Sequence, residues 1–239
     1  MPAKPSSKLL PADAYELTAE DKIRFASEAD AGMVLPTDPV LLTVAQAIAP
    51  AEIAAPAVQD VVTLLLRTAR GQQHTRSKAR SLAKGRMLVG LAAPQVGKRL
   101  CIIVIDTKID QERKKPGKLE CFINPEIIWR SRETEEGREG CFSAGPVWGL
   151  VRRPIAVKIR AYAPDGKQVE HIFEGFTARI VQHEIDHLHG IRFPERITSD
   201  RKRHWVHTDE LKEYPKAMHH WHRICTRARW EAFKQGKIE

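Results

Sequence analysis

The sequence has few cysteines and no long apolar run, and both shortages limit the kind of protein it can encode. Four cysteines among 239 residues do not form a disulfide framework, so each cysteine needs its own explanation. No stretch approaches the ~20 consecutive apolar residues of a transmembrane helix, and the first residues lack the apolar core of a secretory signal. We therefore expect no membrane partner and a cytoplasmic location, with an organelle left open.

Acidic residues are also scarce relative to basic ones, because 39 Lys and Arg face 30 Asp and Glu, a formal net charge of +9. A positive excess attracts polyanions over long range, which makes nucleic acid a candidate partner, but charge alone identifies none. The hydrophobic content of 42% is that of a globular protein. The length is enough for one sizeable core, and we expect one main domain with extensions.

Hydrophobic periodicity predicts an α+β fold. Apolar residues at i, i+3, i+4 and i+7 within residues 56–70 indicate an amphipathic helix. Residues 155–162 alternate between apolar and polar side chains, as a strand does, and "APDGK" after them predicts a hairpin turn. Short strands joined by tight turns, followed by one periodic helix, favour an antiparallel sheet. The other expected elements are an exposed basic loop and three strands, at residues 71–86, 100–106, 119–124 and 168–175.

The periodic helix contains "QHEIDHLHG", residues 182–190, with Gly190 suited to a left-handed cap. At about 100° per residue, His183 and His187 share one stripe with apolar residues. Buried neutral histidines need partners, and one metal ion satisfies both. Glu184 lies about 80° round the helix, where a base could reach a water without ligating the metal. The alternative is two core histidines bonded to carbonyls, with Glu184 in a surface pair, and the pattern alone gives both interpretations equal weight.

Two glycine-flanked stretches add candidate groups. "EGCFSAG", residues 139–145, places Cys141 where the chain can bend closely around a ligand. One thiolate with two imidazoles leaves a coordination position open, as catalytic metal sites do, although a lone cysteine is more often a small buried hydrophobe. "GLAAPQVG", residues 90–97, has a single polar side chain, Gln95. Its amide could donate to a developing oxyanion, or it could be an ordinary loop glutamine.

Taken in order, "GLAAPQVG", "EGCFSAG" and "QHEIDHLHG" resemble the three signature motifs of the peptide deformylases, and supporting segments extend the resemblance over residues 35–198. The resemblance implies an α+β fold in which antiparallel β-sheets pack around a central metal-binding HExxH helix. It implies a hydrolase that removes the N-formyl group from the formyl-methionine of a peptide or nascent chain and releases formate. The metal would be Fe(II), with Zn, Ni or Co as alternatives.

The resemblance also assigns roles to individual residues. A substrate lying as an added strand would bond to the backbone of the first motif. By motif, the metal ligands would be Cys141, His183 and His187, the general base and acid Glu184, the oxyanion donors Gln95 and the backbone N–H of Phe142, and the substrate-binding residues Gly90 and Leu91.

Two departures from the family pattern keep other functions open. Leu88 stands where the family usually has a glycine, and Phe142 replaces the usual leucine. A deformylase-like hydrolase for a non-methionyl or small formylated substrate is therefore one alternative. A zinc endopeptidase that uses the same HExxH is another. A non-catalytic ribosome- or RNA-binding protein with a deformylase-like fold is a third, because the chain is basic.

The sequence divides into an extended N-terminal arm, a catalytic domain and a basic C-terminal helical extension, at residues 1–34, 35–198 and 199–239. Within the extension, periodicity predicts one helix over residues 215–236. Arg223, Arg227 and Lys234 share a stripe of this helix that could contact phosphates of ribosomal RNA. A solvated outer face is the favoured alternative.

Overall fold

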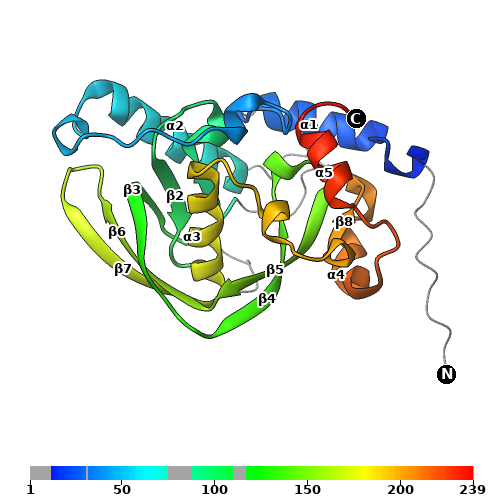
Figure 1. The fold of residues 1–239 in the computed structure, drawn as a ribbon. Coiled ribbons are helices and arrows are strands. Elements are labelled where there is room, and N and C mark those ends of the chain that lie inside the picture. The colour runs from blue at the N-terminus through cyan, green and yellow to red at the C-terminus, as the bar shows by residue number, and fades with distance from the viewer. Residues whose placement is uncertain (1–11, 31, 75–87, 110–116, 239) are drawn as a thin grey trace.

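The computed structural model describes residues 12–30, 32–74, 88–109 and 117–238, and Figure 1 shows a helix lying between two sheets. The helices are α1 (Ala19–Asp30), α2 (Pro56–His74), α3 (Gly175–Leu188), α4 (Tyr214–Ala217) and α5 (Arg227–Lys234). The strands are β1 (Gly90–Ala92), β2 (Ile102–Asp106), β3 (Leu119–Arg130), β4 (Thr134–Gly140), β5 (Val147–Pro154), β6 (Ala156–Tyr162), β7 (Gln168–Glu174) and β8 (Arg203–Trp205). None of the helices in these ranges has the length and apolar character needed to cross a membrane.

The strands form two antiparallel sheets, which confirms the α+β fold class. One sheet has the order β1-β2-β3-β6-β7 and the other has the order β4-β5-β8. Each of β1 and β4 is thus an edge strand of its sheet. Helix α3 contacts β1 and β2 of the first sheet and β5 of the second, so it holds the two sheets together.

Strand β2 shows how α3 is held in place. Its sequence is almost entirely apolar rather than alternating, and every residue in it is buried. Ile102 and Val104 pack in the cluster formed with α2, whereas Ile103 and Ile105 pack in the cluster formed with α3. Successive side chains of a strand point to opposite faces, so the apolar run reflects a sheet covered by a helix on each side. The position of α3 is therefore fixed by the main core.

Most of the expected elements of the main domain are present. The helix expected over 56–70 is α2, which continues to His74, while the rest of the predicted basic loop lies outside the described residues. The predicted hairpin joins β6 to β7, and Gly166 in its turn has a φ of +82°. The strand expected at 119–124 is longer and runs on to Arg130.

The extended arm expected at residues 1–34 is wrong for its second half, because α1 is a helix. The backbone N–H of Asp21 donates to Thr18 Oγ1 at 3.1 Å, and the backbone N–H of Thr18 donates to the Asp21 carboxylate at 3.1 Å. These are the reciprocal bonds of a capping box. The Thr-x-x-Asp spacing was readable in the sequence.

The single helix expected over residues 215–236 is also wrong. The chain instead forms α4, a short 3-10 turn, an extended segment and α5. The extended segment, residues 221–226, lies along β8, where the backbone N–H of Cys225 donates to the carbonyl of Arg203 at 2.8 Å. The Thr226 side chain then caps the start of α5. Pairing with a distant strand therefore prevails over local periodicity.

The two terminal regions pack on each other through Asp21, which is fully buried. Its carboxylate accepts hydrogen bonds from His207 Nδ1 at 2.8 Å and from the backbone and hydroxyl of Thr208 at 2.8 and 2.6 Å. Burial raises the pKa of Asp21, but the bonds from His207 and Thr208 outweigh it and bring the pKa to about 2. The bond to Asp21 raises the pKa of His207.

Replacing Asp21 with asparagine should therefore destabilise the protein in a pH-dependent way. The carboxylate contributes stability above its ordinary pKa of 3.8 and loses it as the pH falls towards 2. The His207 cation contributes below its ordinary 6.5 and loses its contribution as the pH rises through the raised pKa. Urea denaturation should show that the substitution lowers the free energy of unfolding by roughly 2 kcal/mol near pH 5.5 and by less near pH 9. An equal loss at both pH values would contradict this assignment.

Candidate metal centre

The three residues predicted as metal ligands meet at one place. Cys141 Sγ and one ring nitrogen from each of His183 and His187 all lie within 4.8 Å of one another. Cys141 Sγ is 3.4 Å from His187 Nε2, and the two imidazole rings are edge to face with centroids 5.0 Å apart. A cysteine and two histidines at these separations are the donor set of a metal site with one position open.

The two histidines lie one turn apart on α3, whereas Cys141 comes from the link between β4 and β5. This link depends on glycines. A Cβ added at Gly140 would lie 2.3 Å from the ring of Trp148, which is closer than side chains can approach. Gly145 ends the following 3-10 turn, Phe142–Ala144, with a φ of +61° that favours glycine. The expected bend around Cys141 is therefore present.

Glu139 orients His183, and sequence reasoning missed it. The Glu139 carboxylate is buried and accepts hydrogen bonds from Arg153 Nε at 2.6 Å, Arg179 Nη1 at 2.8 Å and His183 Nδ1 at 2.9 Å. Burial raises the pKa of Glu139, but Arg153 holds it far below the usual range. Because this carboxylate can only accept, Nδ1 of His183 carries a proton, and Nε2 is the nitrogen left to face a ligand.

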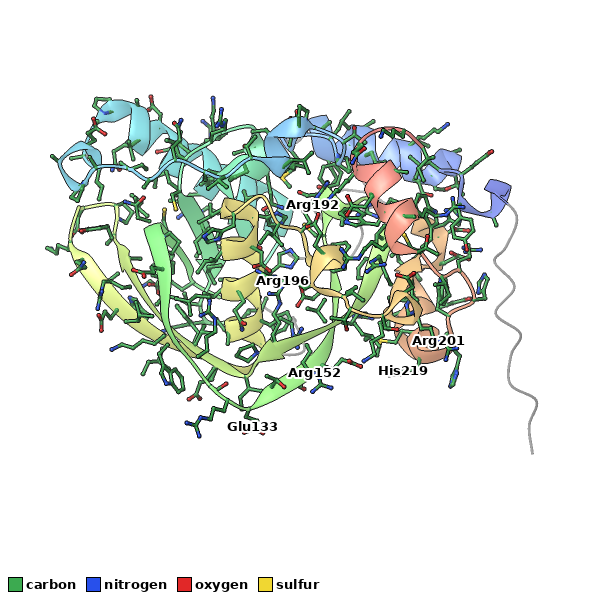
Figure 2. The ribbon with its side chains drawn as sticks, in the orientation of Figure 1. Glu133, Arg152, Arg192, Arg196, Arg201 and His219 are labelled. Atoms are coloured by element: carbon green, nitrogen blue, oxygen red, sulfur yellow. The ribbon has the colours of Figure 1, made fainter. Side chains whose placement is uncertain are left out.

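The charges around α3 form a larger buried network. Arg153 also donates to Asp186 at 2.9 Å, and Arg196, which Figure 2 labels beside α3, pairs with the same carboxylate. The sequence places Asp186 and Arg179 on a polar side of the helix, yet both are buried under the β4–β5 hairpin. Such a network fixes the rotation of α3 and hence the direction of its histidines.

The two imidazoles differ in their proton affinity. Burial lowers the pKa of His183, but hydrogen bonds to Cys141 and Glu139 raise it well above 6.5. Burial and the nearby positive charges of His183 and Arg192 lower the pKa of His187 well below 6.5. His187 is thus a neutral imidazole that can ligate, and the centre as a whole fits a divalent cation in its donor set, its tautomers and its spacing.

Glu184 is buried beside the centre, so the alternative of a surface ion pair is wrong. Its Oε2 has no hydrogen-bond partner among the described residues, and burial raises its pKa to about 7. A Cβ added at Gly90 of β1 would lie 2.5 Å from Glu184 Oε1. Glycine at this position therefore allows β1 to run directly past the carboxyl group. A carboxyl with one free oxygen and a pKa near neutrality suits general acid–base work.

Gln95 lies against the turn that carries Cys141. Its Oε1 accepts from the backbone N–H of Ala92 at 2.8 Å, and its Nε2 donates to Ser143 Oγ at 3.1 Å and to Cys141 Sγ at 3.4 Å. These bonds fix which end of the amide faces the centre. The donor end is therefore aimed at the place where a reacting group would lie.

The remaining predicted residues border the centre. Gly90 and Leu91 belong to β1, whose second edge is unpaired by any strand of the described residues. Phe142 follows Cys141 directly, and its ring packs on Phe25 of α1 with centroids 5.9 Å apart. Leu88 and Phe142, the two departures from the family pattern, both pack in the apolar cluster between α1, α2 and β1.

Comparisons with known proteins agree with the family that the motifs resemble. A family model described as polypeptide deformylase matches residues 32–203. A peptide deformylase of Desulforudis audaxviator is 49% identical over 115 residues, which are 48% of this chain and 70% of that protein. One of Pseudothermotoga lettingae is 44% identical over 114 residues, 48% of this chain and 61% of that protein.

Solved structures show the same similarity. The actinonin-bound class I type b peptide deformylase of Acinetobacter baumannii aligns with a TM-score of 0.57 at 31% identity, covering 70% of this chain and 97% of that chain. The same enzyme with bound Met-Ala-Ser aligns with a TM-score of 0.55 at 31% identity, covering 70% of this chain and 99% of that chain.

Proposed function

Because the chain belongs to the polypeptide deformylase family, its activity is removal of the N-formyl group from nascent peptides, and we propose that this activity resides in the centre of Cys141, His183 and His187. One observation carries the assignment of the site. Three ligand atoms within 4.8 Å of one another stand beside a buried carboxyl group, Glu184, that keeps one oxygen unpartnered. Binding or core packing alone would not require that combination.

The metal would be held by Cys141 and by the two imidazoles, with Glu139 behind His183. We propose Fe(II), with Zn, Ni or Co as alternatives, because a thiolate with two imidazoles suits all four. When bound, the metal makes water acidic enough to supply hydroxide near neutral pH. A thiolate ligand leaves an Fe(II) site open to oxidation. Metal analysis of protein purified without oxygen tests the choice of Fe(II). A dominant metal other than Fe(II) would overturn it.

Glu184 would carry the protons of the reaction. Its free Oε2 takes a proton from the attacking water, and the same oxygen later returns it to the amine nitrogen that leaves as the new amino terminus. A group with a pKa of about 7 is able to do both at neutral pH. The products are formate and a free amino terminus.

Gln95 and the backbone N–H of Phe142 would hold the charge that develops on the formyl oxygen. The Gln95 amide is oriented by its bonds to Ala92 and Ser143, and the N–H that donates to Cys141 Sγ would donate to the formyl oxygen instead. Preorganised donors are the usual source of the largest electrostatic contribution to catalysis.

Replacing Gln95 with glutamate should therefore lower kcat strongly without unfolding the protein. Glutamate keeps an acceptor for the Ala92 N–H and replaces the amide donor with a buried carboxylate, which repels the charge that develops on the formyl oxygen. We expect kcat to fall by roughly 10²- to 10³-fold while KM changes little. Steady-state formate release measures both constants. The control is Gln235→Glu, at an exposed position. A Gln95→Glu protein with the kcat of wild type would contradict the oxyanion role.

The substrate would lie as an extended strand along β1, with its backbone bonded to Gly90 and Leu91. β1 is an edge strand, and added strands bind to such edges. The related Acinetobacter enzyme binds Met-Ala-Ser, which supports a peptide substrate. We propose methionine as the first residue, with a non-methionyl or small formylated compound as the alternative. Formate release from formyl tripeptides that differ only in the first side chain separates them, and equal rates would exclude a methionine preference.

Ribosome contact through the basic C-terminal region stays a prediction. Of the three cations in the predicted stripe, Arg223 pairs with Glu210 and Lys234 pairs with Glu195, whereas Arg227 is exposed. These ion pairs favour the solvated outer face over RNA docking. Co-sedimentation with ribosomes at increasing salt tests the contact. A ribosome-bound protein in the cytoplasm, with no deformylase activity, would support the non-catalytic alternative.

A further inference from the structure

Arg192 holds the turn that carries the cysteine of the centre. It is 1% exposed, and its Nη1 donates to the carbonyl of Ser143 at 2.9 Å and to the carbonyl of Pro36 at 2.6 Å. Ser143 lies two residues after Cys141 in the 3-10 turn Phe142–Ala144. One guanidinium therefore connects the turn to the segment between α1 and α2.

The C-terminal helix supports this guanidinium. Arg192 lies between α3 and α5 in Figure 2, and its Cζ is 4.6 Å from the ring centroid of the buried Trp230. A second residue of α5, Phe233, packs against Gly145 at the end of the cysteine turn. A Cβ added at Gly145 would lie 2.4 Å from the Phe233 ring. Lys234 of α5 also forms an ion pair with Glu195, with Nζ 2.8 Å from Oε1.

This support comes from a part of the chain outside the family match. The match ends at residue 203, whereas α5 begins at Arg227. Helix α5 thus lies beyond the matched residues, and its buried face contacts the back of the cysteine turn. Its Trp230 and Phe233 belong to the same apolar cluster as Ala144, with Cys141 packed against it.

The chemistry of Arg192 argues against a purely space-filling role. Its Nε and Nη2 are buried without a hydrogen-bond partner among the described residues. A buried guanidinium that leaves donors unpaired costs stability, and an apolar side chain would fill the same space without that cost. What only the guanidinium provides is the pair of bonds to the Ser143 and Pro36 carbonyls, together with a positive charge near the Cys141 sulfur.

We propose that Arg192, seated on Trp230, is a positioning residue that fixes the Cys141–Ser143 turn and so aims both the sulfur and Gln95. The second effect follows because Gln95 Nε2 donates to Ser143 Oγ at 3.1 Å. This inference rests on the proposed metal centre. Removing the support should loosen the geometry of the reaction more than the binding of the peptide, since the guanidinium bonds to the carbonyls of Ser143 and Pro36 rather than to β1, where the peptide would lie.

The test compares Arg192→Met, Arg192→Lys and the control Arg203→Met. Arg203 is likewise buried and donates to the carbonyls of Pro194 and Ile197, but it does not touch the cysteine turn. Each protein is loaded with Co(II), and the thiolate-to-cobalt absorption is recorded. Hydrogen exchange of the peptide covering residues 141–146 is measured in the metal-free proteins.

For Arg192→Met we expect an altered cobalt spectrum, faster exchange in this peptide and a kcat lower by roughly 10- to 100-fold with little change in KM. Arg192→Lys should recover part of each effect, because an ammonium keeps the charge and donates to one carbonyl. Arg203→Met should lose stability while keeping the wild-type spectrum. If Arg192→Met does not fold, Trp230→Leu removes the aromatic ring on which the guanidinium packs and gives the same comparison.

The outcomes separate the two proposals. A wild-type protein that folds but shows no thiolate–cobalt absorption would overturn the metal centre and the positioning role together. A wild-type absorption that Arg192→Met leaves unchanged, with unchanged exchange and kcat, would overturn only the positioning role. Equal spectral changes in Arg192→Met and Arg203→Met would also overturn it, because they would report general loosening.

Discussion

Replacing Glu184 with glutamine should lower kcat for formate release by roughly 10²- to 10⁴-fold while leaving fold and metal content intact. Glutamine has the shape of glutamate but cannot take up or release the proton that the reaction transfers. The loss follows from the position of Glu184, whose Oε2 is buried and unpartnered among the described residues, beside β1. Steady-state kinetics with metal analysis of the same samples measure this effect.

The same substitution should not weaken the fold. Burial raises the pKa of Glu184 to about 7, which means that the folded protein disfavours its carboxylate form. A neutral amide removes that cost, so the melting temperature should stay equal or rise. Glu133→Gln, an exposed position at the start of the β4–β5 hairpin, is the control. A Glu184→Gln protein that retains wild-type kcat would contradict the assigned role.

Replacing Cys141 with serine should remove the metal. A serine hydroxyl is a poor ligand for the proposed ions, and loss of a direct ligand should weaken metal affinity by more than the roughly 10- to 100-fold typical of its outer partners. Formate release at equimolar metal should fall to background. Competition with a chromophoric chelator measures the affinity of each protein.

Cys101→Ser is the matched control for this experiment. Cys101 is partly buried, burial raises the pKa of its thiol to about 11, and it lies outside the ligand cluster. Its replacement should leave metal affinity and kcat unchanged. Equal affinities of wild type and Cys141→Ser would exclude Cys141 as a ligand.

The helix of the site was predictable from local pattern. Its periodicity places His183 and His187 on one stripe, and the cap at Gly190 has the expected positive φ of +69°. The meeting of Cys141 with these histidines was not accessible in that way, because it depends on how the β4–β5 hairpin crosses α3. Only the resemblance of the ordered motifs predicted it.

The buried charges show what the sequence could not reveal. A helical wheel identifies Arg179 and Asp186 as polar, but it does not say which strand will cover them. In the structure Glu139 of β4 and Arg153 of β5 supply their partners. Tertiary pairing also explains the error in the C-terminal region, where β8 holds residues 221–226 extended.

We propose that this chain acts as a metal-dependent deformylase through the centre at Cys141, His183 and His187. The most direct measurement is formate release from formyl-Met-Ala-Ser by protein stripped with a chelator and then reloaded with Fe(II) without oxygen. We predict no release by the stripped protein and full recovery at one metal ion per chain. Folded, fully loaded protein that releases no formate, or release that does not depend on metal, would contradict the claim.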